Sequence, residues 1–358
     1  MDGLERRGGE LLIFLHKFAN MLIVKRGAIS HITDWVPVNR KIMVVTDSGV
    51  PFQYAQSVLS CCPDAYCHVF APGEDNKTLQ TVQGILSDML ENGFTRTDAV
   101  IAVGGGVVGD IAGFAAASYM RGIDFYNVPT TLLSQVDSSI GGKTGVNLDG
   151  VKNVVGAFHM PKAVVIDPDC LATLEPRLLH EGLAEAIKMA ATSDAALFSL
   201  IEEEGPLEPK LEMIISGALA IKEAVVEQDP TEKGLRRVLN FGHTVGHAIE
   251  AASAAENAAS QSGPSGAGAL FHGESVAIGM LYMCSDSVRS RLEPLLKRYE
   301  LPVRDHFDTE TLLSYIGHDK KKAGDSITAV YVNRIGSFEF RKMDMEQMRQ
   351  CINNWKKV

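Results

Sequence analysis

Short apolar runs alternate with helical patterns along the first half of the chain. Five of these runs are bounded by turn residues and predict buried strands, at residues 41–46, 65–70, 99–103, 124–128 and 163–166. Residues 78–92 instead repeat apolar side chains at helical spacing. Strands that alternate with helices predict a parallel sheet with helices on its faces.

The pattern becomes mainly helical after about residue 170. Helical spacing predicts helices at residues 178–192, 211–227, 242–255, 273–290 and 292–299. Residues 327–332 and 336–340 predict a late hairpin, and the Ala-, Ser- and Gly-rich residues 254–269 predict a surface loop. We therefore expect a Rossmann-like α/β domain over residues 1–170 and a mainly α-helical domain over residues 171–358.

Charge and composition exclude several classes of protein. The net charge of −10 argues against nucleic acid as a partner. No run of about 18 or more apolar residues suggests a membrane span, and the apolar residues 11–24 predict a core helix or a strand pair. The N-terminus lacks the layout of a signal peptide, and the six cysteines form no C-x-x-C pair. We therefore expect a cytoplasmic protein with free thiols.

The third predicted strand ends in the glycine-rich turn Gly104-Gly-Gly-Val-Val-Gly109. This G-x-G-x-x-G pattern allows backbone N–H groups at a helix N-terminus to approach a phosphate. The same pattern also suits an ordinary glycine turn between a strand and a helix. It departs from the usual dinucleotide fingerprint, because it follows the third strand rather than the first and no acidic residue closes a strand about 20 residues later.

Two further motifs place candidate metal ligands at helical spacing. Glu185 and Lys188 lie three residues apart in an otherwise apolar helix, so this acid is either half of an exposed ion pair or a buried group that needs a partner such as a metal. His243 and His247 lie four residues apart, and His272 follows in a second glycine-flanked motif. Such histidines suit a metal site, although single histidines are more often ordinary core or surface residues. The residues between them do not match the metalloprotease pattern.

Several cationic residues in apolar or glycine-rich surroundings are candidates for binding an anion. They are Arg121, Lys143, Lys152, Lys222, Arg236, Lys320, Lys321 and Lys322. Each of them alone also suits a solvated surface charge. Lys143 follows two glycines in a turn typical of phosphate binding, but the upstream spacing of a P-loop fails because residue 137 is Asp.

Taken in order along the chain, these motifs resemble the 3-dehydroquinate synthase family of sugar-phosphate cyclases. The resemblance covers most of the chain, from Val44 to Arg341. It rests on the glycine turn with Asp110 and on the segments Tyr119-Met-Arg-Gly122, Val128-Pro-Thr-Thr131, Gln135-Val-Asp-Ser-Ser-Ile-Gly-Gly-Lys-Thr-Gly-Val-Asn147, Lys152-Asn153, Gly182-Leu-Ala-Glu185, Leu239-Asn-Phe-Gly-His-Thr-Val-Gly-His-Ala-Ile-Glu250 and His272-Gly-Glu274.

The resemblance implies a homodimer of two-domain subunits with NAD and a divalent metal, zinc or alternatively cobalt. The implied metal ligands are Glu185, His243 and His272. The residues implied to bind or border NAD are Asp47, Glu74, Lys77, Gly104, Gly105, Gly106, Val107, Asp110, Thr130, Thr131, Asp137, Lys143, Lys152 and Thr173. The first domain is thus expected to bind NAD, and the second to bind the metal and the substrate.

The family's substrate is 3-deoxy-D-arabino-heptulosonate 7-phosphate, a phosphorylated sugar acid. The implied phosphate contacts are Arg121, Lys143, Lys152, Asn153 and His247, with one of Lys320 and Lys321. The implied contacts to its carboxylate and hydroxyls are Lys188, Lys222, Arg236 and Asn240, and Asp137 also belongs to the substrate site. The residues implied in catalysis are Asp137, Lys143, Lys188, Lys222, Glu232, Arg236, Asn240 and His247.

The implied reaction oxidises a ring hydroxyl with NAD, eliminates phosphate, reduces the ketone, opens the ring and closes a carbocycle. Three alternatives stay open: a sister cyclase acting on sedoheptulose 7-phosphate or an amino variant, a metal-dependent polyol dehydrogenase that releases NADH, and a non-catalytic homologue. Lys222, Arg236 and Asn240 argue against the sister cyclase, because a buried pair of cations needs an anion such as a carboxylate. The chain departs from the family at residues 173–176, 180–181 and 254–269, without losing an implied catalytic group.

Overall fold

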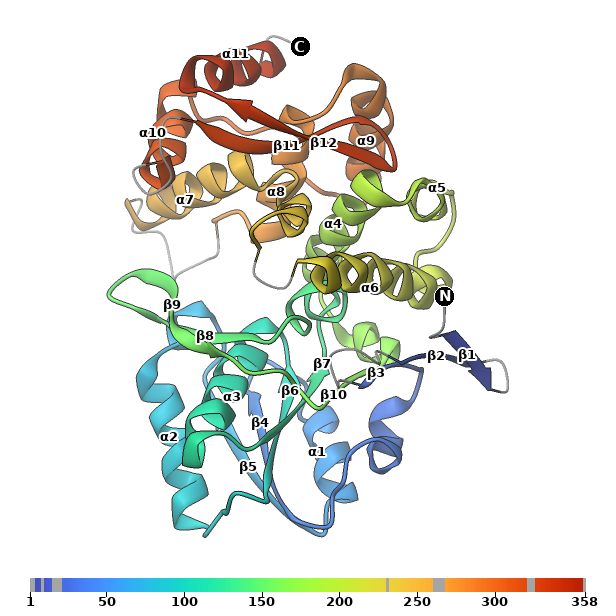
Figure 1. The fold of residues 1–358 in the computed structure, drawn as a ribbon, viewed down its shortest axis with the longest axis vertical. Helices are drawn as coiled ribbons and strands as arrows, with labels where there is room; N and C mark the ends of the chain where they lie inside the picture. Colours follow the sequence, from blue (N-terminus) through green and yellow to red (C-terminus); the bar gives the residue numbers. More distant parts are fainter. Residues whose placement is uncertain are drawn as a thin grey trace. The chain divides into compact units, whose positions relative to one another are not determined.

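The structure is a computed structural model that divides into two compact units, Met1–Glu175 and Pro176–Val358 (Figure 1). It describes the backbone of residues 4–7, 10–14, 21–229, 232–259, 268–320 and 326–356, and the side chains of these residues except 4–14 and 318–320. None of the helices described is both long enough and apolar enough to cross a lipid bilayer.

The first unit is built on an eight-stranded sheet in the order β1-β2-β3-β10-β7-β6-β4-β5. Its strands are β1 (Leu4–Arg7), β2 (Glu10–Phe14), β3 (Met21–Val24), β4 (Lys41–Asp47), β5 (Asp64–Phe70), β6 (Ala99–Gly104), β7 (Asp124–Pro129) and β10 (Ala163–Ile166). The strands from β3 to β5 in this order run parallel, which confirms the predicted parallel sheet and its five predicted strands. Strand β2 pairs antiparallel with β3, so the described parts of residues 11–24 form a strand pair rather than a helix.

Successive residues of the central strands point to opposite faces of this sheet. On β4, Ile42 and Val44 lie in a core with α1 (Phe52–Cys61), whereas Met43 and Val45 lie in a core with α2 (Leu79–Glu91) and α3 (Gly106–Ser118). Both faces of the sheet are therefore covered by helices, as is usual for parallel strands. Helix α2 confirms the helix predicted over residues 78–92.

A β-hairpin that the sequence did not predict packs against α3. It pairs β8 (Lys143–Leu148) with β9 (Val151–Phe158), and Val146 and Val155 contact the core that contains α3. The phosphate-binding turn expected around Lys143 is therefore wrong in part, because Lys143 begins a strand and only the preceding Gly141 and Gly142 form the turn. The hairpin has no strong apolar run because most of β9 is exposed.

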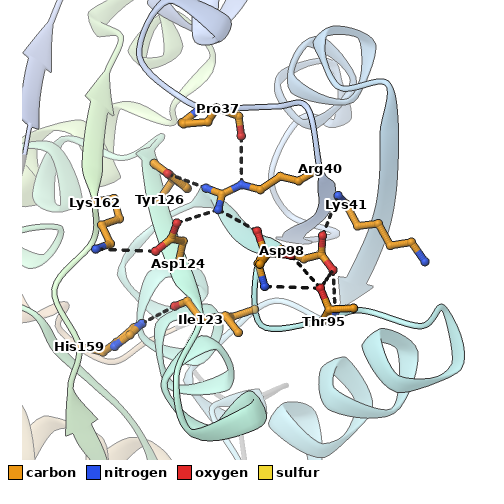
Figure 2. Close-up of polar contacts among 11 residues, drawn as sticks. Pro37, Arg40, Lys41, Thr95, Asp98, Ile123, Asp124, Tyr126, His159 and Lys162 are labelled. Carbon is orange, nitrogen blue, oxygen red and sulfur yellow. Dashed lines mark hydrogen bonds and ion pairs between the residues drawn. The ribbon is translucent and has the colours of Figure 1, made fainter.

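Strands β4, β6 and β7 begin at a cluster of polar contacts around Arg40 (Figure 2). Arg40 donates hydrogen bonds to a carboxylate oxygen of Asp124 and to the hydroxyl of Tyr126, each at 2.7 Å. Asp98 accepts a hydrogen bond from the backbone N–H of Lys41 at 3.0 Å. These contacts fasten the amino end of the sheet, and ligands of such sheets bind at the opposite, carboxyl end of the strands.

The second unit is mainly helical, as predicted. Its helices are α4 (Pro176–Ser193), α5 (Ala195–Glu202), α6 (Leu211–Gln228), α7 (His243–Ala259), α8 (His272–Tyr282), α9 (Asp286–Arg298), α10 (Thr309–Lys320) and α11 (Met345–Lys356). The predicted late hairpin is confirmed as β11 (Ile327–Arg334) with β12 (Ser337–Met343). Shorter helical turns in the two units are η1 (Ala28–Asp34), η2 (Glu74–Asn76), η3 (Tyr119–Arg121), η4 (Ser134–Ser138), η5 (Pro168–Thr173), η6 (Glu208–Lys210) and η7 (Leu235–Asn240).

Three boundaries predicted in this unit are wrong. The helix expected over residues 273–290 ends at Tyr282. The next helix, expected over residues 292–299, begins already at Asp286, because the Ser285 side chain accepts a hydrogen bond from the backbone N–H of Val288. The loop expected over residues 254–269 is wrong at its start, because α7 continues to Ala259, and residues 260–267 lie outside the described part of the chain. Alanine-rich residues are good helix formers, which explains the longer helix.

Candidate active site

The glycine turn lies at the carboxyl end of β6 and opens helix α3. Gly105 precedes the helix and Gly106 is its first residue. A Cβ atom on Gly106 would lie 2.9 Å from the hydroxyl oxygen of Ser138, and one on Gly105 would lie 3.1 Å from the Thr131 methyl carbon. The turn therefore packs closely against the segment after β7, where a side chain would force its neighbours to move, and a glycine turn at a helix N-terminus lets backbone N–H groups approach a phosphate.

Several residues expected near NAD are linked to one another beside this turn. The buried Lys77 ammonium forms an ion pair with Asp110 of α3 at 2.6 Å and donates a hydrogen bond to Asn153 of β9 at 2.5 Å. Asn147 of β8 donates a hydrogen bond to Glu74 at 2.9 Å. The turn at residues 74–77, the start of α3 and the β8–β9 hairpin are thus fastened together.

The other residues expected in the first unit occupy different places. Asp110 and Lys143 line one small cavity together with Ser138. Asp47 ends β4, where burial raises the pKa of its carboxyl group although the backbone N–H groups of Gly49 and Val50 donate to it. The expected residues that flank the turn or follow β7 at the same end of the sheet are Gly104, Val107, Thr130 and Asp137. Thr173 lies in η5, where its hydroxyl contacts that of Tyr54 at 2.8 Å.

The structure does not bring Arg121 to the glycine turn. Arg121 follows the last residue of α3, whereas Gly106 begins that helix, and a helix of this length spans about 20 Å. Arg121 is exposed and lies near the start of β7, the end of the sheet that Arg40 fastens. Lys152 is also exposed, on β9.

In the second unit, three helices direct one candidate metal ligand each toward a common point. Oε1 of Glu185 on α4 lies 3.9 Å from Nε2 of His243 on α7 and 3.6 Å from Nε2 of His272 on α8. Ligand atoms of a tetrahedral zinc ion lie roughly 3.4 Å apart, which follows from zinc–ligand distances of about 2.0–2.2 Å. His247 lies one turn after His243, and ligand atoms of the three histidines also lie within 4.8 Å of one another.

Close packing of α7 against α8 explains why the histidine motifs contain glycines. A Cβ atom on Gly279 of α8 would lie 2.0 Å from the carbonyl oxygen of Gly242, and one on Gly246 of α7 would lie 3.0 Å from the carbonyl oxygen of Ser275. Only glycine permits this approach, and the ring centroids of His243 and His272 are consequently 5.2 Å apart.

The buried carboxylate of Glu185 is held ionised by its neighbours. Burial alone would raise the pKa of Glu185, but the ammonium of Lys188 and the imidazoles of His272 and His243 hold it well below its ordinary value. Apart from its ion pairs with these three residues, neither oxygen accepts a hydrogen bond of good geometry within the described part of the chain. A buried carboxylate with unused lone pairs beside two imidazoles is a donor set that fits a divalent cation.

The hydrogen bonds of the two imidazoles leave their Nε2 atoms facing Glu185. Nδ1 of His243 donates to the carbonyl oxygen of Phe241 at 3.1 Å, and Nδ1 of His272 donates to Glu250 at 3.1 Å. Burial and the Lys188 ammonium lower the pKa of His243 to about 3, so this imidazole is neutral and able to bind a metal. Burial would lower the pKa of His272, but the neighbouring carboxylates of Glu185 and Glu250 raise it to about 10, so a positive charge on the His272 imidazole is favoured.

A pocket of about 590 Å³ adjoins His243 and His247. Asn240 and Glu232 line it as predicted site residues, and the Asn240 amide donates a hydrogen bond to Glu232 at 3.1 Å. The remaining expected cations of this unit, Lys188, Lys222 and Arg236, are buried. Lys321 and the side chain of Lys320 lie outside the described residues.

Sequence reasoning missed residues that contact the site or its ligands. Arg237 lines the pocket beside Asn240. Glu250 binds His272, and its place seven residues after His243 on the same helix face was an available signal. Arg177 and Glu274 fasten the start of α8, which depends on packing that the sequence does not reveal.

Comparison with known proteins identifies relatives over nearly the whole chain. Models for the N-terminal and C-terminal parts of 3-dehydroquinate synthase match residues 67–181 and 182–322. A 3-dehydroquinate synthase of Enterococcus faecalis is 39% identical over 364 residues, which cover 96% of this chain and 98% of that relative.

Solved structures with the same fold include two cyclases with bound cofactors. ValA, the 2-epi-5-epi-valiolone synthase of Streptomyces hygroscopicus with NAD+ and Zn2+ bound, is 25% identical with a TM-score of 0.82, over 96% of this chain and 98% of that chain. A 2-deoxy-scyllo-inosose synthase in complex with carbaglucose-6-phosphate, NAD+ and Co2+ is 26% identical with a TM-score of 0.78, over 93% and 96% of the two chains.

Proposed function

Because this chain belongs to the 3-dehydroquinate synthase family, we propose that it converts 3-deoxy-D-arabino-heptulosonate 7-phosphate to 3-dehydroquinate and phosphate. This is a step of the shikimate pathway, which supplies aromatic amino acids. The observation that carries the proposal is the convergence of Glu185, His243 and His272 on one point beside a pocket. The reaction breaks the carbon–oxygen bond to phosphate, so the enzyme is a carbon–oxygen lyase.

We propose NAD and a divalent metal ion, zinc or cobalt, as its cofactors. When bound, NAD accepts and returns a hydride, and the metal ion lowers the pKa of the hydroxyl that is oxidised. The glycine turn at Gly104, Gly105 and Gly106 binds the pyrophosphate through backbone N–H groups. Glu185, His243 and His272 hold the metal.

The buried cations of the second unit select an acidic substrate. Lys188, Lys222 and Arg236 are each 5% exposed or less, and a cation in such surroundings attracts an anionic group more strongly than it does in bulk water. Lys222 and Arg236, with Asn240, bind the carboxylate and hydroxyls, while the ammonium of Lys188 also keeps Glu185 ionised. Asn240 is oriented for this role by its hydrogen bond to Glu232.

The phosphate is held by side chains that donate to its oxygens and stabilise the charge that develops as it leaves. We assign this role to Lys143, Lys152, Asn153 and His247, with Arg121 and one of Lys320 and Lys321. Asn153 is positioned by Lys77, and its backbone N–H donates to Asn147. Asp137, in the η4 turn, completes the proposed substrate site.

Phosphate release from 3-deoxy-D-arabino-heptulosonate 7-phosphate tests this function. The purified protein receives NAD and zinc, and sedoheptulose 7-phosphate is assayed in parallel. We expect release from the first substrate alone, without accumulation of NADH, and its loss in the Glu185→Gln variant. Release from sedoheptulose 7-phosphate alone would identify a sister cyclase. Accumulation of NADH without phosphate would instead identify a dehydrogenase.

The remaining features of the family are proposals of the same kind. We propose that residues 1–170 bind NAD and residues 171–358 bind the metal and most of the substrate, in a homodimer located in the cytoplasm. Sedimentation velocity of the purified protein tests the homodimer. A monomer that releases phosphate at full rate would contradict it.

A further inference from the structure

One face of helix α4 meets the start of α8 in a regular register. Arg177, Glu181 and Glu185 lie at intervals of four residues, so they occupy one face of α4 over three successive turns. Arg177 contacts Glu274, Glu181 contacts Gly273, and Glu185 faces His272. The candidate ligands Glu185 and His272 therefore lie at one end of this row of contacts, and the Arg177–Glu274 pair lies at the other end.

Arg177 and Glu274 form a bidentate salt bridge. Nε of Arg177 donates to Oε1 of Glu274 at 2.6 Å, and Nη2 donates to Oε2 at 2.7 Å. Nη2 also donates to the carbonyl oxygen of Ala269 at 3.0 Å, and the guanidinium lies 4.0 Å from the ring centroid of Phe271. A bidentate pair of this kind fixes angle as well as distance, because two parallel hydrogen bonds must be satisfied together.

The same contacts hold the chain on both sides of His272. The Glu274 side chain accepts a hydrogen bond from the backbone N–H of Phe271 at 2.8 Å. A Cβ atom on Gly273 would lie 2.2 Å from the carbonyl oxygen of Glu181, so Gly273 has no space to move toward α4. His272 is thus flanked by residues whose positions Arg177 and Glu181 determine.

We propose that the Arg177–Glu274 pair is a positioning element that sets the separation of Glu185 and His272, and thereby the affinity of the site for its metal. The inference rests on the proposed ligand set. Glu274 is only 6% exposed, so its charge requires a partner, and a hydrophobic pair of similar size would fill the space without directing it. Arg177 lies eight residues before Glu185 on α4, and its effect is transmitted through the register of the two helices.

Zinc affinity of a variant in which both partners are replaced tests the proposal. Arg177→Met with Glu274→Met removes the bidentate salt bridge without leaving a buried charge unpaired. Its zinc dissociation constant, measured by competition with a chromogenic chelator, is expected to rise by about 10–100-fold, as for other groups that orient metal ligands. The absorption spectrum of the Co2+-loaded protein is expected to change as well, since it reports ligand geometry. Arg177→Lys retains the charge but cannot donate two parallel hydrogen bonds. Its zinc dissociation constant is expected to lie between those of the double variant and the native protein.

A second bidentate pair in the same unit provides a matched control. Arg291 donates to Glu202 at 2.9 and 2.6 Å through the same two nitrogens, and its guanidinium lies 5.1 Å from the ring centroid of Phe198. Arg291→Met with Glu202→Met repeats the chemical change away from the ligands. Its zinc dissociation constant is expected to stay within about threefold of the native value, a change well below that of an orienting group.

The outcomes separate positioning from stability. Unchanged zinc affinity in the Arg177/Glu274 variant would overturn the proposal, and so would an equal loss in the control variant. Failure of the native protein to bind zinc would overturn the ligand set and this inference together. Failure of phosphate release by a protein that binds zinc would contradict only the proposed function.

Discussion

His272 donates a hydrogen bond from Nδ1 to Glu250 across 3.1 Å, which leaves its Nε2 atom facing Glu185. The two residues come from different helices, since Glu250 lies on α7 and His272 begins α8. A carboxylate that binds the outer nitrogen of a metal-ligating histidine fixes its tautomer and increases its basicity. We therefore expect Glu250 to act on a bound metal through His272.

Replacement of Glu250 by alanine is expected to weaken zinc binding by about 10–100-fold, because the His272 ring loses the acceptor that orients it. Glu250→Gln retains an acceptor without the charge and is expected to have a smaller effect. Chelator competition measures both dissociation constants. Glu256→Ala is the control, because Glu256 lies on the same helix and binds a histidine, His306, at 2.9 Å. Equal losses in the Glu250 and Glu256 variants would contradict the specific role.

Substitution of the α7 histidines distinguishes two ligand sets. Glu185, His243 and His272 form the proposed set, whereas His243, His247 and His272 also lie close enough to hold an ion. We expect His243→Ala to abolish stoichiometric zinc binding. His247→Ala should retain the zinc and lose most phosphate release, since His247 is exposed at the pocket and is assigned to the phosphate. Loss of zinc from the His247 variant would favour the three-histidine set.

The sequence predicts the sheet well because its strands are buried on both faces. Ile42 and Met43, adjacent on β4, enter opposite cores, so both must be apolar and the run is easily recognised. The β8–β9 hairpin cannot be recognised from its apolar and polar positions. Val151 and Val154 are about half exposed, and the hairpin is stabilised by backbone pairing. Exposed strands do not produce apolar runs.

The candidate ligands stand out in the sequence by their spacing, whereas most of the residues that orient them do not. Glu185 and His243 stand in motifs that are short and local. Whether Arg237 reaches the pocket depends on the turns of η7, and the pairing of Arg177 with Glu274 joins residues 97 positions apart. Such contacts depend on tertiary packing, which local patterns do not encode.

A methyl group in the glycine turn is expected to weaken NAD binding on the order of tenfold, because backbone N–H groups can no longer approach a pyrophosphate closely. In Gly106→Ala the new Cβ atom would lie 2.9 Å from the Ser138 hydroxyl oxygen, so either this hydroxyl must rotate away or the turn must shift. Isothermal titration with NAD measures the effect. Gly84→Ala in α2 is the control, since its Cβ atom would meet only the His68 ring, at 3.2 Å. Native NAD affinity in the Gly106 variant would show that the turn is structural.

The pair of Glu202 and Arg291 is expected to make the stability of the second unit pH-dependent. Hydrogen bonds from Arg291 lower the pKa of Glu202 below its unfolded value of about 4.3, so the folded state binds fewer protons in this range. The contribution is therefore complete above the unfolded pKa and disappears as the pH falls through the folded pKa. For a partly exposed pair it amounts to about 0.5–1 kcal/mol.

Urea denaturation of a Trp35→Phe reference protein, and of the same protein with Glu202→Gln added, measures this contribution. In both proteins Trp355 alone reports on the second unit. We expect the reference protein to be more stable by this amount at pH 7. The two stabilities should converge in acid, because protonation of Glu202 removes the charge that the Gln variant lacks at every pH. A difference that persists unchanged after Glu202 is protonated would show that shape, rather than charge, stabilises this contact.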